Sequence, residues 1–333
     1  MKSSLFRIAL GALAFATAIS PAQARENLEA SFDSALGTEL RDPPRYVARY
    51  DTDLERQIAQ LADGSKGRIG IAALDLATGH EISVLGDQRF PMASTSKIAI
   101  AAAYLEGVDQ GRWTLDQKWP LMVPQRSAPF SSARAPVKAG NSLSAHQLIE
   151  LMITRSSNPA TDALLAAVGG PDVVNDWMRR AGIEEFTLSR DIATLVRDDG
   201  EFDPARHVDI RDSATPRAMV QLLAGLHKGE WLSAHSTGVL IGAMERCITG
   251  KRRIPALMPA GVQVAHKTGS LNNTSSDIGF VTAPDGRTIA VAIYVTGQGS
   301  KPNREARIAE LARAVYDGYG RSSTQWVNAN YDR

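Results

Sequence analysis

Apolar and polar positions recur along the chain with periods that predict one antiparallel sheet built from both ends. Residues 51–62 carry apolar side chains at helical spacing, residues 68–76 alternate as a strand, and residues 81–85 pair back as a hairpin. Beyond them, an amphipathic helix is expected over residues 303–316. The strands expected near the C-terminal end lie at residues 262–269, 276–283 and 288–296.

The middle of the chain is expected to be all-helical. Thr215 and Pro216 mark one helix start, since proline suits the first helical position. Residues 111–141 show no sustained period and are expected to form a long exposed loop, and the charged segment after Thr187 up to Asp212 is expected to be irregular. Further helices are expected at residues 144–155, 158–168, beyond Gly170, and at 233–246.

This order of elements predicts an α/β (α+β) fold, in which helices flank an antiparallel sheet and an all-helical domain is inserted. The catalytic domain is expected over residues 51–320. Its α/β lobe would comprise about 51–90 and 216–320, and its helical lobe about 91–215.

The two ends of the chain are predicted to lie outside this domain. Residues 1–24 have the basic start, short apolar run and Ala-x-Ala end of a secretory signal peptide, so the mature protein is expected to be periplasmic or secreted. Residues 25–50 are interpreted as a polar arm and residues 321–333 as a polar tail. No later stretch is long and apolar enough to predict a membrane span.

The charge balance and the metal-binding residue types exclude several functions. With 37 basic and 36 acidic residues, the net charge of +1 gives no reason to expect a nucleic-acid partner. The six histidines form no paired zinc motif, so no metal and no cofactor are expected. The single cysteine, Cys247, excludes an intrachain disulfide and is expected to be a small buried apolar residue. A monomer is expected.

A hydroxyl and an amine lie three residues apart at Ser94 and Lys97, where an apolar helix begins. Positions three apart share a helix face. Because the following residues 98–105 are apolar all round, Lys97 is expected to be buried with a lowered pKa. A neutral Lys97 would activate Ser94, and the free N–H groups at the helix start suit an oxyanion. A Ser-x-x-Lys pair alone is a weak signal.

Two further stretches carry polar groups of the right kind. Ser156 and Asn158 lie between two predicted helices, where they would either face a cleft or form an ordinary helix N-cap. Lys267 and Thr268 lie on a predicted strand beside Gly269, which permits close approach of a ligand.

In this order and spacing, the three motifs resemble those of the penicillin-recognising serine hydrolases, most closely the class A β-lactamases. The resemblance covers about residues 51–320 and includes the stretch 249–254 ahead of His266. It implies Ser94 as the acylating nucleophile and Lys97 as its proton partner. It further implies the following roles: Ser156 as relay to the leaving nitrogen, Asn158 on the substrate amide, Lys267, Thr268 and Gly269 at the substrate carboxylate, and the N–H groups of Ser94 and Ser270 as the oxyanion hole.

The chain departs from the family pattern at two places. Ser157 stands where class A has an aspartate. The deacylating glutamate is also missing. Counting back from Asp212 without gaps places Asp199 at its position, with Glu201 two residues on, and makes Arg197 the partner of Asp212 in the loop-closing ion pair. Anchoring on Ser189 and Arg190 instead places Ile192 there, which has no basic group. We prefer the gap-free count.

Three functions remain compatible with these residues. The first is a β-lactamase that acylates at Ser94 and hydrolyses the ester with water activated by Asp199 or Glu201. The second is a D,D-peptidase or acyltransferase acting on peptidoglycan stem peptides, favoured by the missing glutamate. The third is a silent protein that only binds β-lactams or wall fragments. The expected partner is therefore a small molecule, either a β-lactam or a stem peptide.

Overall fold

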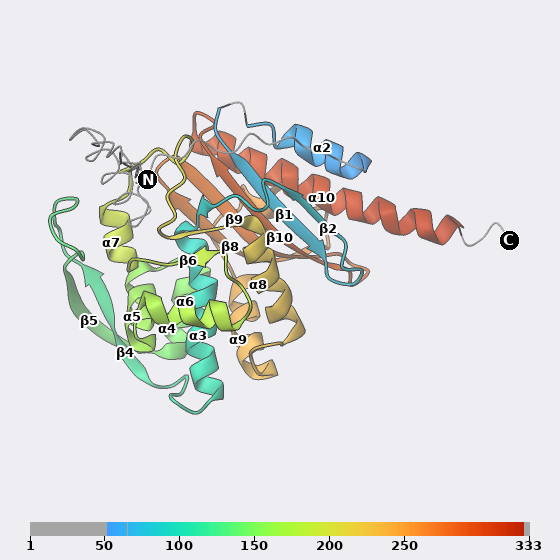
Figure 1. The fold of residues 1–333 in the computed structure, drawn as a ribbon. Coiled ribbons are helices and arrows are strands. Elements are labelled where there is room, and N and C mark those ends of the chain that lie inside the picture. The colour runs from blue at the N-terminus through green and yellow to red at the C-terminus, as the bar shows by residue number, and fades with distance from the viewer. Residues whose placement is uncertain (1–51, 65, 330–333) are drawn as a thin grey trace, which may run out of the picture. The chain divides into compact units, whose positions relative to one another are not determined.

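A five-stranded antiparallel sheet forms the centre of the computed structural model, which describes residues 52–64 and 66–329 (Figure 1). In the order β2-β1-β10-β9-β8, two strands from the N-terminal end are joined to three from the C-terminal end through the β1–β10 pair. Their bounds are β1 (Ile69–Asp75), β2 (Glu81–Val84), β8 (Gln263–Leu271), β9 (Thr274–Thr282) and β10 (Thr288–Thr296). Ile69 lies opposite Val295 in the β1–β10 pair. The predicted sheet, built from both ends, is confirmed.

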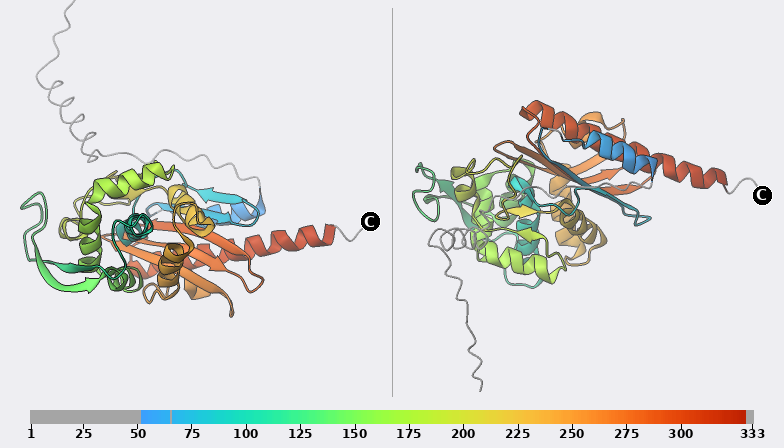
Figure 2. Two further views of the ribbon diagram at one scale, coloured as in Figure 1. Left: turned by 90° about the horizontal axis from the view of Figure 1, so that it is seen from below. Right: turned by 45° about the horizontal axis from the view of Figure 1, so that its top comes forward.

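Two helices cover one face of this sheet, α2 (Asp53–Leu61) and α10 (Lys301–Ala329), which lie side by side in Figures 1 and 2. The apolar sides of both helices pack on the sheet, with Ile58, Ile293 and Leu311 fully buried between them. This apolar layer holds the N-terminal and C-terminal helices on the same face.

The other face of the sheet packs against α8 (Pro216–Lys228), beyond which lie the remaining helices. Thr215 caps α8 by accepting a hydrogen bond from the backbone of Ala218. Most of the side chains of α3 are buried, as its apolar sequence predicts. Besides α8, the helices on this side of the sheet are α3 (Lys97–Asp109), α4 (Ala145–Thr154), α5 (Asn158–Val168), α6 (Pro171–Arg180) and α9 (Ala234–Glu245).

Three short strands connect the segment before Ser94 to the long loop that ends at Asp212. They are β3 (Phe90–Pro91), β6 (Phe186–Thr187) and β7 (Ser213–Ala214), in the order β3-β7-β6. The backbone N–H of Met92 continues this link by donating to the carbonyl of Asp212 at 3.0 Å. The chain just before Ser94 is therefore tied to the end of this loop.

The structure corrects three of the predicted elements. Residues 111–141 are not a loop throughout, because β4 (Lys118–Pro124) and β5 (Val137–Ser144) form a hairpin that projects from the helices in Figure 1, so the region is not all-helical. The segment 188–212 contains a short helix, α7 (Ile192–Arg197). Helix α10 continues past the predicted end at residue 316, where Gly318 packs against Leu54 of α2, and runs on into the predicted polar tail as far as Ala329.

The predicted signal peptide and the polar arm lie outside the described residues. Within the described part of the chain, no helix combines the length and apolar character needed to cross a bilayer.

Candidate active site

Ser94 lies in a single 3₁₀ turn, η1 (Ala93–Ser96), that leads directly into α3. The Lys97 N–H donates to the carbonyl of Ser94, and Thr95 ties the turn down by donating from its hydroxyl to Met92 O at 2.8 Å. Ala93 adopts a φ of +49°, in the left-handed region that is unfavourable for residues other than glycine. The fold thus accepts backbone strain at the residue immediately before Ser94.

Lys97 is fully buried, and its ammonium nitrogen is held entirely by neutral oxygens. It donates to Ser156 O at 2.8 Å, to Asn158 Oδ1 at 2.8 Å and to Ser156 Oγ at 3.2 Å. Burial, reinforced by the positive charge of Lys267, lowers the pKa of Lys97 well below its ordinary value. The predicted buried lysine is therefore confirmed, and it is suited to accept a proton.

Ser156 is presented to this lysine by an unusual backbone conformation between α4 and α5. Its φ is +57°, again in the left-handed region, while the next residue, Ser157, caps α5 by accepting from Ala160 N at 3.4 Å. The N-cap interpretation thus applies to Ser157, and the Ser156 hydroxyl is left to face Lys97 and Lys267.

Strand β8 brings the third motif to the same place. Lys267 is fully buried and donates to Ser156 Oγ at 3.0 Å and to Thr268 O at 2.9 Å. Burial lowers the pKa of Lys267 to about 8. A side chain at Gly269 would collide with Met92 O and Ser276 Oγ, since an added Cβ would lie 2.7 and 2.4 Å from them. Glycine is therefore required for β8 to pack against the Ser94 turn.

One cleft connects these groups to solvent. Its lining includes Ser94, Ser156, Asn158, Thr268 and Ser270 from the predicted motifs. A nucleophile and neighbouring hydroxyls thus line one space, and the buried amines of Lys97 and Lys267 lie behind it on the Ser156 hydroxyl. These are the groups needed for acyl transfer to a substrate that carries an anionic group.

The sequence and the fold both match known β-lactamases. A family model described as "Beta-lactamase enzyme family" matches residues 53–319. The chain is 29% identical over 276 residues to the extended-spectrum β-lactamase PER-1 of Pseudomonas aeruginosa, which covers 79% of this chain and 86% of that protein. It is 31% identical over 272 residues to β-lactamase CTX-M-8 of Citrobacter amalonaticus, and this match covers 80% of this chain and 89% of that protein.

Solved structures agree. A variant of the class A β-lactamase of the last common ancestor of Gram-negative bacteria superposes with a TM-score of 0.70 at 35% identity, covering 81% of this chain and 100% of that one. A β-lactamase from Chitinophaga pinensis gives the same TM-score of 0.70 at 26% identity, covering 80% and 100%. The chain belongs to the class A branch of the β-lactamase enzyme family.

The loop of this β-lactamase that was expected to carry the deacylating acid is closed by a different ion pair from the one predicted. Asp212 binds Arg190, with 2.6 Å between Oδ2 and Nε, and its Oδ1 accepts from the backbone N–H groups of Ser189 and Arg190. The predicted pairing of Asp212 with Arg197 is wrong, because Arg197 pairs with its neighbour Asp198. The loop therefore follows the anchoring on Arg190 that places Ile192, a residue without a basic group, at the glutamate's position.

Helix α7 of the β-lactamase begins at Ile192 and is held by a buried carboxylate on α5. Asp162 accepts from Ile192 N at 2.7 Å and from Ala193 N at 2.9 Å. Burial raises the pKa of Asp162 to about 6, although these two hydrogen bonds and the charge of Lys97 oppose the shift. Asp162 thus links the loop to the interior beside Lys97.

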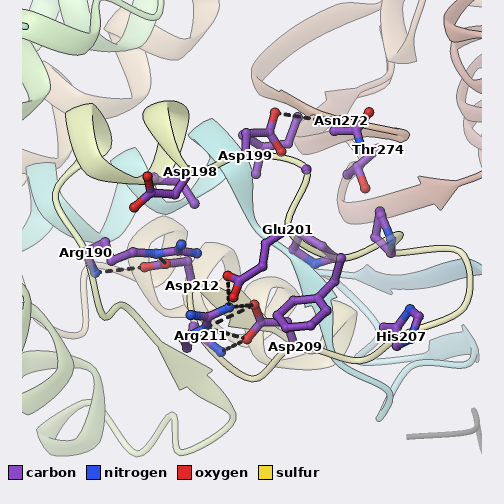
Figure 3. A pocket seen from close by; sticks show the side chains of 16 residues that line it. Arg190, Asp198, Asp199, Glu201, His207, Asp209, Arg211, Asp212, Asn272 and Thr274 are labelled. Atoms are coloured by element: carbon purple, nitrogen blue, oxygen red, sulfur yellow. Dashed lines mark hydrogen bonds and ion pairs between the residues drawn. The ribbon is translucent and has the colours of Figure 1, made fainter. Parts of the chain in front are cut away.

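The structure does not bring Asp199 and Glu201 to Ser94. Both line a separate pocket between the 190–212 loop and the end of β8 (Figure 3). Asp199 accepts from the backbone N–H of Asn272 at 2.7 Å, and burial raises its pKa. Glu201 points toward Arg211 in Figure 3 and forms an ion pair with it at 2.7 Å. Their role as bases stays a prediction.

Sequence reasoning missed several residues that line the cleft of this β-lactamase. Arg253 is buried and donates to Ser270 Oγ at 2.6 Å and to Gly269 O at 2.8 Å, while pairing with Glu305 at 3.2 Å. Thr249 and Lys301 also line the cleft. Arg253 stands next to the exposed Arg252 in the sequence, and no local pattern distinguishes the two.

Proposed function

We propose that this β-lactamase opens β-lactam rings through an acyl-enzyme on Ser94, with Lys97 as the base for acylation. The observation that carries the proposal is that the buried Lys97 amine donates its three hydrogen bonds to neutral oxygens. A lysine in such surroundings favours its neutral form, which can take the proton of the Ser94 hydroxyl.

The remaining roles follow from the contacts around Ser156. Its hydroxyl is within hydrogen-bonding distance of both Lys97 and Lys267, so it can pass a proton from Lys97 to the lactam nitrogen as the ring opens. Lys267 and Thr268 would receive the substrate carboxylate and Asn158 the acyl amide. Gly269 keeps β8 close to Ser94, so that the N–H groups of Ser94 and Ser270 would hold the oxyanion.

Deacylation needs a base for water, and Asp199 is the better of the two acids for it. Its pKa is raised by burial, whereas Glu201 is engaged by Arg211. Asp199 is also bound to Asn272, only two residues beyond Ser270. Reaching the ester requires the 190–212 loop to move, because Asp199 does not line the Ser94 cleft in this conformation.

The relatives favour hydrolysis over the peptidase alternative, since PER-1 and CTX-M-8 are both named β-lactamases. The basic, apolar and Ala-x-Ala pattern of residues 1–24 supports export of this enzyme to the periplasm, where it would act as a monomer.

The test is a time course of intact-protein mass for residues 25–333 mixed with excess benzylpenicillin. We expect a transient adduct that clears while the penicillin gains one water, and no adduct with Ser94→Ala. Asp199→Asn should prolong the adduct, and Glu201→Gln should not. An adduct on Ser94 that persists for hours in the unmodified protein would contradict hydrolysis, and an equal lifetime in Asp199→Asn would exclude Asp199 as the base.

A further inference from the structure

A chain of buried polar side chains runs behind the substrate-binding end of β8 and ends at Thr268. It begins at Asp277, which is completely buried on β9 and bound to His266. Beside His266 lies Cys247, whose Sγ is 3.3 Å from the Thr249 hydroxyl. The last step joins the hydroxyl oxygens of Thr249 and Thr268 at 2.7 Å. Thr249 and Thr268 line the cleft, whereas His266 is buried and Cys247 is half-buried. Cys247 is therefore not the purely apolar residue that the sequence predicted.

The direction of each hydrogen bond along this chain follows from the number of protons that each side chain can donate. Asp277 can only accept, so the Nδ1 of His266, 2.9 Å from both carboxylate oxygens, carries a proton and donates it. Although burial opposes the shift, the neighbouring His266 lowers the pKa of the Cys247 thiol. Although burial disfavours a charged imidazole, the Asp277 carboxylate raises the pKa of His266 to about 10.

The single thiol proton of Cys247 is used by the backbone, because Sγ donates to the Thr249 carbonyl oxygen at 3.8 Å. Sγ is then left to accept from the Thr249 hydroxyl, 3.3 Å away. Once Thr249 donates its only proton to Sγ, it must accept in its 2.7 Å contact with Thr268. The Thr268 proton therefore points toward Thr249 and away from the cleft.

We propose that Cys247 is a positioning residue that acts through Thr249 to hold the proton of the Thr268 hydroxyl away from the substrate carboxylate. This inference rests on the proposed function, in which Thr268 receives that carboxylate. When an anion enters, the Thr268 proton turns to it, Thr249 donates to Thr268 instead, and Sγ loses its donor. The loss of the hydrogen bond to Sγ makes the net binding free energy of the carboxylate less favourable.

Removing the acceptor at position 247 should release the restraint. Cys247→Ala leaves Thr249 free to donate to Thr268, so that Thr268 already points its proton into the cleft. We expect KM for benzylpenicillin to fall about three- to tenfold, the range of one weak hydrogen bond, with kcat unchanged. Cys247→Ser supplies a hydroxyl that can donate to the Thr249 carbonyl and accept from the Thr249 hydroxyl, and should keep the original KM.

A second variant tests the path rather than the cysteine alone. Thr249→Val removes the intermediate hydroxyl and should lower KM by a similar factor, and the double variant should match either single variant because both cut the same chain. If the effects of the two single variants on KM multiply in the double variant, or if Cys247→Ala and Cys247→Ser change KM equally, this relay from Cys247 through Thr249 to Thr268 is not operating. A Cys247→Ala effect on thermal stability with KM unchanged would reduce Cys247 to a packing residue.

The same variants placed in Ser94→Ala separate this inference from the proposed function. There the dissociation constant of benzylpenicillin, measured by calorimetry, replaces KM and needs no turnover. Tighter binding with Cys247→Ala supports the relay even if the unmodified protein proves not to hydrolyse penicillin, and unchanged binding overturns the relay even if it does.

Discussion

Lys97 and Lys267 place their side-chain nitrogens 3.2 and 3.0 Å from one hydroxyl oxygen, that of Ser156. Each amine is buried, and the charge of Lys267 is one cause of the lowered pKa of Lys97. Protonation of one of two neighbouring amines disfavours protonation of the other, so the two are suited to different tasks, one as a base and the other as an anion-binding ammonium.

Activity should therefore fall at alkaline pH through Lys267. Its pKa of about 8 means that the amine loses its charge above that pH and no longer attracts the substrate carboxylate. We expect kcat/KM to decline above pH about 8, with the change mainly in KM. Lys267→Arg should be less active at neutral pH but should lose this decline, since a guanidinium stays charged. A pH profile of kcat/KM for both proteins checks this, and an unchanged alkaline limb in Lys267→Arg would assign the decline to another group.

Stability at acidic pH should depend on Asp162. Its folded pKa of about 6 lies above the ordinary 3.8, so the folded protein binds more protons than the unfolded chain between these values. The contribution of Asp162 to stability therefore falls as pH rises from about 4 to about 6 and is constant above. Asp162→Asn should be less stable at neutral pH, because one backbone N–H of α7 loses its acceptor, and the dependence on pH should disappear. Melting temperatures from pH 4 to 7 test this, and parallel curves for the two proteins would contradict it.

The ion pair that closes the 190–212 loop should matter far more than one on the surface. The Asp212 side chain is 3% exposed and binds Arg190 as well as two backbone N–H groups, so Asp212→Asn should cost about 3–5 kcal/mol and make the loop sensitive to protease. The matched control is Asp176→Asn, which removes an exposed pair with Arg179 and should change stability by less than about 1 kcal/mol. Equal losses of unfolding free energy for the two variants, measured in urea, would show that burial does not make the Asp212–Arg190 pair more stabilising.

Two glycines should respond in opposite ways to replacement by alanine. In Gly269→Ala the new methyl group would collide with Met92 O, which should push β8 away from the Ser94 turn and lower both kcat and stability. Gly238 lies on the exposed side of α9 with open space around it, so Gly238→Ala should stabilise the protein by about 0.5–1 kcal/mol and leave activity intact. Thermal unfolding and initial rates distinguish the two, and an active, stable Gly269→Ala would show that this approach is not required.

The sheet and the buried helices could be predicted because apolar residues recur in them with a clear period. The hairpin β4–β5 could not be predicted, because its sequence has no such period. Six of the eight residues of β5 are exposed, so neither face of the strand is marked by apolar side chains. Helix α7 has only six residues, and its first turn depends on Asp162, which lies on another helix. Short elements that rely on distant partners leave little local signal in the sequence.

Within the site, the Ser94 and Lys97 pair could be predicted because both residues belong to one local turn. The partner of Asp212 could not, because a count along a loop of uncertain length gave Arg197, whereas the contact is made by Arg190. The polar chain through Cys247 was also missed, since it joins residues from the segment 246–253, which follows α9, and from strands β8 and β9.

The pairing of β1 with β10 has a consequence for how the chain folds. Residues 69–75 find their partners at 289–295, so the centre of the sheet cannot form until nearly the whole sequence is available. Contacts so distant along the chain are slow to form, and until then β1 is paired only with β2 and its other edge is open. The Ser94 turn, which is packed against β8, is accordingly one of the last features to be completed, and an emerging or C-terminally shortened chain cannot be active.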